Sequence, residues 1–121
     1  MGLFEAVVKV GTLQEGRPVF TDEVSLLVDT GAAYSMIPSE VLQRAGIAKL
    51  GSVTIKLTDG TTAEKSFGVA VLEIAGHIVG ANVLFGGAGD LGLLGVTSLE
   101  LASLAVDPVG KRLVSAAAIQ A

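Results

Sequence analysis

The segment Asp29-Thr30-Gly31-Ala32 combines the residue types that could carry acid–base chemistry in this chain of 121 residues. It directly follows the apolar run 24–28, which predicts a buried strand that delivers one carboxylate to a tight glycine turn. Water is a poor nucleophile, but two adjacent carboxylates that share one proton can supply a base and an acid together. Asp29 is therefore the main candidate for a catalytic residue. The alternative is an aspartate that serves only the turn, because Asp and Gly are common turn residues.

A second apolar element lies toward the C-terminal end, where the pair Leu93-Leu94 is followed by Gly95. A strand that ends in Asp-Thr-Gly-Ala and a later hydrophobic-hydrophobic-Gly element rarely occur together in one small β-rich chain. The pair resembles the single-lobe, retropepsin-like aspartic proteases, and the resemblance covers nearly the whole chain. It implies an all-β fold with short helices, in the closed, β-barrel-like form of the acid proteases. It also implies an endopeptidase in which Asp29 activates water against a peptide bond.

The number of Asp-Thr-Gly segments bears on the expected assembly. The chain holds one such segment and is too short for two lobes, whereas a proton-sharing dyad needs two carboxylates. The resemblance therefore implies a symmetric homodimer in which Asp29 of each subunit meets its partner on the two-fold axis. It further implies that the Thr30 hydroxyl bonds main chain of the other subunit. An ordinary hydroxyl satisfied within its own subunit is the alternative.

The remaining residues of the predicted active-site loop are small. Gly31 is expected to let the backbone turn beside the carboxylate, where a Cβ atom would obstruct it. Ala32 stands where many two-lobed relatives carry Ser or Thr, and it matches the viral pattern. The resemblance implies a peptide or protein substrate, and we expect no cofactor and no metal.

Substrate contacts are expected from a hairpin and from the second apolar element. The Asp-Gly pair at 59–60 is a strong hairpin signal and falls about where the family places its flap, although such a pair is more often just a turn. The resemblance implies that Leu93 lines a substrate pocket, whereas plain core packing suits Leu94 and Gly95. The expected flap residues are Leu57, Thr58, Asp59, Gly60 and Thr61.

Other chemistries find little support in the sequence. A Ser-His-Asp triad would have to use His77, the only histidine, which lies beside a glycine at a predicted turn. Multi-histidine zinc sites cannot form within one chain. The glycine-rich segment 86–92 lacks the Gly-Lys-Ser/Thr ending of a phosphate-binding loop and is interpreted as a mobile connection.

Composition and charge limit the classes of protein to which this chain can belong. Half of the residues are apolar, 17% are charged and the net charge is −4, which predicts one globular domain over residues 1–121. No basic patch is present and aromatic residues make up 4%, so nucleic acid is not an expected partner. Cysteine is absent and the N-terminal residues lack the basic segment of a signal peptide, which favours a cytoplasmic location. The most apolar stretch, 74–89, is shorter than the ~20 residues that a membrane span needs, so no membrane partner is expected.

Hydrophobic patterning places these motifs on a β-rich framework with two short helices. A first helix is expected over 39–45, with Pro38 at its first position and Gly46 after its end. A second is expected to begin at the capping box 97–100 and to carry Leu101 and Leu104 inward. The predicted strands cover 4–10, 19–28, 53–57, 67–74 and 78–85, with a final hairpin of 105–107 and 113–114. A turn is predicted over 14–18, around Gly16, and Gly76 lies in the predicted connection between 67–74 and 78–85.

The sequence thus predicts a homodimeric aspartic endopeptidase. Two other functions stay open at this stage. One is a non-catalytic module that uses the same fold to bind a peptide or protein. The other is a small structural β-barrel, in which Asp29 matters only for stability.

Overall fold

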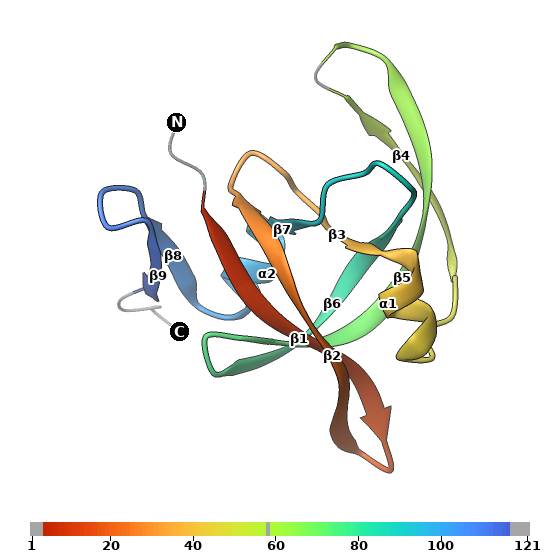
Figure 1. The fold of residues 1–121 in the computed structure, drawn as a ribbon, viewed down its shortest axis with the longest axis horizontal. Coiled ribbons are helices and arrows are strands. Elements are labelled where there is room, and N and C mark those ends of the chain that lie inside the picture. The colour runs from red at the N-terminus through yellow and green to blue at the C-terminus, as the bar shows by residue number, and fades with distance from the viewer. Residues whose placement is uncertain (1–3, 58, 117–121) are drawn as a thin grey trace.

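A seven-stranded sheet organises the computed structural model, which describes residues 4–57 and 59–116 (Figure 1). The strand order is β1-β2-β7-β3-β6-β5-β4, and β1 also pairs with β5, so that six of these strands close into a ring. β4 pairs with β5 outside the ring, and β8 and β9 form a separate two-stranded sheet. The strands are β1 (Glu5–Gln14), β2 (Arg17–Asp29), β3 (Ser35–Pro38), β4 (Gly51–Lys56), β5 (Thr62–Ile74), β6 (His77–Gly86), β7 (Leu93–Gly95), β8 (Leu104–Asp107) and β9 (Arg112–Ser115). The predicted all-β class with short helices is confirmed.

The core fills the inside of the ring. Alternation along the strands decides which side chains enter it: Val8 and Val10 of β1 are fully buried, whereas Val7 before them and Lys9 between them are exposed. β6 alternates in the same way up to Asn82, but its last four residues, 83–86, are all buried where the strand pairs with β3. The largest fully buried side chains are Leu26, Ile37, Leu42, Leu72, Ile74, Leu84, Leu94 and Leu99. Residues from nearly every strand therefore meet in one core.

Two tight turns set the register of the long hairpins. Glu15 and Gly16 have φ values of 52° and 75°, and Ala75 and Gly76 have values of 48° and 83°. Two successive left-handed residues are the mark of the two-residue turn whose twist suits antiparallel strands. The glycine in each turn was the sequence signal for it, and the structure confirms both connections.

Helix α1 (Ser39–Arg44) lies where the sequence predicts it. Pro38 is its capping residue rather than its first helical residue, because it still belongs to β3 with an extended ψ of 135°. Gly46 follows the helix with a φ of 77°, as expected for a glycine after a helix end.

Helix α2 (Val96–Leu101) corrects two predictions. Its capping residue is Gly95 and no side chain caps it, so the predicted capping box is wrong and Thr97 lies inside the helix. Leu101 is 54% exposed, and Leu104 is buried but belongs to β8, whereas the helix buries Leu99. The reason is that Gly95 is the last residue of β7, so the helix starts directly after the strand.

No helix among the described residues is long and apolar enough to cross a membrane. The stretch 74–89 instead forms the turn after β5, all of β6 and the start of the following loop.

Candidate active site

Asp29 is the last residue of β2, at the point where that strand ends beside β7. The two strands run parallel, with Leu27 opposite Leu93, and Asp29 opposite Gly95. The buried residues Leu26 and Val28 fix the strand in the core. The carboxylate of Asp29 is thereby carried to the edge of the sheet, where its side chain is half-buried.

The loop after Asp29 folds back on the carboxylate. The backbone N–H of Gly31 donates to Oδ1 of Asp29 at 2.9 Å, and the N–H of Ala32 donates to the Asp29 carbonyl at 3.1 Å. A Cβ atom at position 31 would lie 3.2 Å from the same Oδ1, closer than side chains usually approach. Glycine at 31 thus leaves room for the carboxylate. Thr30 is exposed in the single chain.

The second apolar element lies directly against this loop. The N–H of Val96 donates to the Ala32 carbonyl at 2.8 Å. A Cβ atom at Gly95 would lie 2.5 Å from the carbonyl oxygen of Tyr34 and 2.8 Å from that of Ala32, so only glycine fits. The structure therefore brings together the two motifs that the sequence separates by more than 60 residues.

Two buried serines join the same elements and were missed by the sequence analysis. The Oγ of Ser35 accepts the N–H of Gly95 at 3.0 Å and lies 2.7 Å from the Oγ of Ser98. Their residues are only 1% and 2% exposed. The only sequence signal for their burial was that each serine precedes an apolar residue, Met36 after Ser35 and Leu99 after Ser98. Nothing in the spacing of the two serines shows that they meet.

The candidate flap is the tip of the arm formed by β4 and β5, which projects beyond the rest of the sheet in Figure 1. The N–H of Leu57 donates to the Thr61 carbonyl, and that of Gly60 to the Leu57 carbonyl. Hydrogen bonds from the Thr61 side chain and N–H lower the pKa of Asp59. This segment is therefore a well-bonded turn, as predicted. Thr58 lies outside the described residues.

Leu93 differs from its neighbours in β7. It is partly exposed, whereas Leu94 is fully buried and Gly95 is covered by the loop after Asp29. Leu94 and Gly95 thus pack in the interior, as the sequence analysis expected. Leu93 is left with an accessible side chain two residues before the position opposite Asp29.

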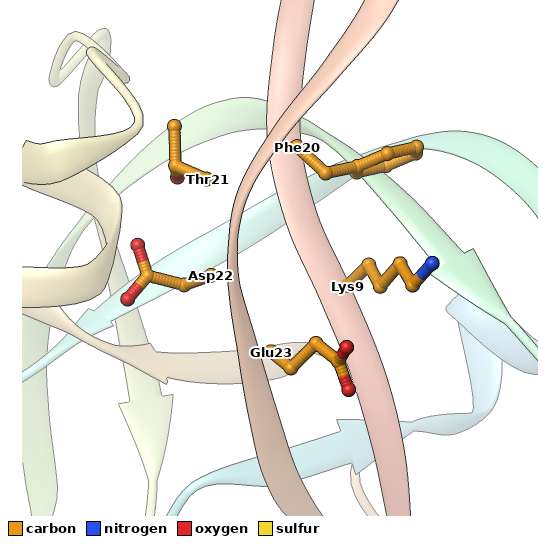
Figure 2. Close-up of a pocket in the computed structure, with 5 residues that line it drawn as sticks. All are labelled: Lys9, Phe20, Thr21, Asp22 and Glu23. Carbon is orange, nitrogen blue, oxygen red and sulfur yellow. The ribbon is translucent and has the colours of Figure 1, made fainter.

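The hollow shown in Figure 2 is a second surface feature, and it does not include the Asp29 loop. It lies on the β1–β2 hairpin and is lined by Lys9, Phe20, Thr21, Asp22 and Glu23. Thr21 and Asp22 point to one side of the hairpin and the other three side chains to the opposite side. From Glu23 to Asp29 the strand spans about 20 Å, at ~3.3 Å per residue. This hollow is therefore separate from the Asp29 loop.

No three His, Cys, Asp or Glu side chains lie close enough together to hold a metal ion in the part of the chain that the structure describes. His77 is exposed at the β5–β6 turn, where its Nδ1 lies 3.1 Å from the Ala75 carbonyl oxygen. It is thus a solvent-facing first residue of β6 beside the turn, as expected.

Comparison with models of known protein families shows which family the chain belongs to. The model described as "gag-polyprotein putative aspartyl protease" matches residues 20–100, which is more than half of the chain. The chain belongs to this family of retropepsin-like aspartyl protease domains. The matched range includes Asp29, the arm and β7. The comparison with curated proteins gave no match.

Proposed function

We propose that the chain is a homodimeric aspartic endopeptidase whose catalytic group is Asp29, one from each subunit. The observation that carries this proposal is the bracing of the Asp29 carboxylate. The carboxylate lies at the end of a core strand and accepts the Gly31 N–H. Its loop is held by the first residue of α2, because the Val96 N–H donates to the Ala32 carbonyl. A carboxylate that served only a turn would not need the second element packed against its loop.

The proposed chemistry requires two such carboxylates close together. Because both cannot ionise cheaply, the pair holds one proton between them. The ionised carboxylate takes a proton from water as the water oxygen attacks the peptide carbonyl, and the protonated one gives its proton to the carbonyl oxygen. The tetrahedral intermediate then collapses: the protonated carboxyl gives its proton to the leaving amine, and the ionised carboxylate takes a proton from a hydroxyl of the intermediate as the carbon–nitrogen bond breaks. Both carboxyl groups end the cycle sharing one proton again.

A second copy of the chain would supply the missing carboxylate. Thr30, Gly31 and Tyr34 are exposed around Asp29, so the loop is open to a partner in this protomer. The Thr30 hydroxyl would bond main chain of the other subunit and lock the two loops together. A C₂ dimer makes these contacts twice, once from each subunit.

Residues 57–61 and Leu93 are the proposed substrate contacts. The arm would lie over an extended peptide, and the exposed part of Leu93 would line a pocket for one of its side chains. A cytoplasmic location is part of the proposal, because a cysteine-free chain needs no oxidising compartment to fold.

A peptide-library cleavage assay of the Asp29→Asn variant tests the assignment. Asn is nearly isosteric but cannot act as the base, so cleavage should be lost while sedimentation and thermal unfolding stay close to wild type. Asp107→Asn is the matched control, because Asp107 accepts the N–H two residues onward just as Asp29 does. Cleavage retained by purified Asp29→Asn protein would refute the assignment. Peptide binding without cleavage by the wild type would favour a non-catalytic binding module.

A further inference from the structure

The loop between β6 and β7 is tied to the arm by one carboxylate. Oδ2 of Asp90 accepts the N–H of Gly87 at 2.7 Å, which closes the loop on itself. The same oxygen forms an ion pair with the ammonium group of Lys65 on β5. Asp90 thus holds its own loop and reaches a second element at the same time.

Lys65 lies at the place on β5 where the arm leaves the ring of strands. β5 pairs with β6 from Ile74 back to Phe67, which lies opposite Leu84. Before Phe67, β5 leaves β6 and pairs with β4 alone, with Lys65 opposite Val53. Lys65 therefore stands just beyond the last backbone bond to the ring, at the base of the arm. Its side chain bridges back to the ring-side loop.

Burial and charge support a persistent contact. The two side chains are 20% and 32% exposed, so both are partly withdrawn from water. The hydrogen bond from Lys65 and the one from the Gly87 N–H lower the pKa of Asp90, which keeps this carboxylate ionised in mild acid. The ion pair can thus persist in mildly acidic solution.

The two elements joined here are the two proposed walls of the substrate site. The arm carries the proposed flap at its tip, and Asp90 lies three residues before Leu93. We propose that Lys65 and Asp90 are positioning residues, which hold the arm at a fixed height over an extended peptide and thereby set its affinity. This inference rests on the proposed role of the arm in peptide binding, and not on cleavage itself.

Hydrogen exchange of the arm amides tests the mechanical part. In Lys65→Met the amides of 51–57 and 62–66 should exchange several-fold faster, because the arm opens more often, while the ring strands stay protected. Lys9→Met is the matched control. Lys9 of β1 forms an ion pair with Glu73, which lies on β5 like Lys65, but at a place where backbone hydrogen bonds to β1 and β6 already hold β5. Lys65→Arg keeps the charge and should restore slow exchange. Equal arm exchange in Lys65→Met and Lys9→Met would overturn the inference.

Peptide affinity tests the functional part without any need for turnover. In the Asp29→Asn background, a library-derived peptide should bind about 3–10-fold more weakly when Lys65→Met is added, and unchanged with Lys9→Met. In the active enzyme the same change should raise KM and leave kcat within about twofold. Unaltered affinity, or no peptide binding at all, would overturn the positioning role. Absence of cleavage with the affinity effect preserved would instead refute only the proposed catalysis.

Discussion

The Oγ atoms of Ser35 and Ser98 lie 2.7 Å apart in the core, although 63 residues separate them in the chain. Ser35 begins β3, the strand that follows the Asp29 loop, and Ser98 lies in α2, the helix that follows the second apolar element. Because Ser35 also accepts the N–H of Gly95, one hydroxyl ties three segments behind the Asp29 loop. This buried polar contact supports the candidate site without touching it.

Loss of the Ser35 hydroxyl should therefore destabilise the fold. Ser35→Ala leaves the Gly95 N–H and the Ser98 hydroxyl buried without this partner, at an expected cost of about 1–3 kcal/mol in the free energy of unfolding. Urea denaturation measures this cost. Ser52→Ala, at an exposed position of β4, is the control and should change stability by less than ~0.5 kcal/mol. Equal effects of the two substitutions would mean that the buried serine contact carries no net stability.

Gly95→Ala should be more damaging than any serine variant. Its methyl group would lie 2.5 Å from the Tyr34 carbonyl oxygen. The nearest atoms all belong to the backbone of Tyr34 and Ala32, so no flexible side chain can move aside. We expect a loss of at least ~3 kcal/mol or failure to fold, since overpacking against backbone strains the whole loop. Gly80→Ala serves as control, because nothing lies within 4 Å of a Cβ atom there. Thermal unfolding of both variants decides the matter, and a stable Gly95→Ala protein would contradict the close approach.

Activity should depend on protein concentration. If each subunit supplies one Asp29, mass action makes specific activity fall on dilution below the dissociation constant of the dimer. Sedimentation and cleavage rates measured over the same concentration series should fall together. Constant specific activity at concentrations where the protein sediments as a monomer would rule out the shared site.

Acid should destabilise the protein through aspartates with lowered pKa values. The side-chain hydrogen bond from Arg44 lowers the pKa of Asp22, so the native state binds fewer protons than the unfolded state near pH 4. The stability from this pair is present above the unfolded pKa of about 3.9 and is lost as the pH falls through the lower folded value. Arg44→Met should therefore flatten the fall in Tm between about pH 5 and pH 2.

The control for that measurement is Arg17→Met, because Arg17 is exposed and forms no ion pair with any of the described residues. Its Tm should follow the wild-type curve as the pH falls. An Arg44→Met curve parallel to that of the wild type would show that the Asp22–Arg44 pair does not contribute to acid sensitivity.

Local patterns determined much of this protein from the sequence alone. The strand before Asp29, the tight turns at Gly16 and Gly76 and the helix before Gly46 follow from short-range rules, and each lies where it was predicted. Such features depend on residues that are neighbours in the chain, so the sequence alone is enough to predict them.

Contacts between distant segments were decided only by the tertiary structure. β3 was not predicted, because its four residues gain strand form from β6 and β7 on either side rather than from their own pattern. Helix α2 starts one residue before its predicted capping box, since the pairing of Asp29 with Gly95 ends the strand there. The Ser35–Ser98 contact and the Lys65–Asp90 ion pair likewise depend on how the ring closes. Sequence patterns record local preference, whereas closure of the ring selects which distant groups meet.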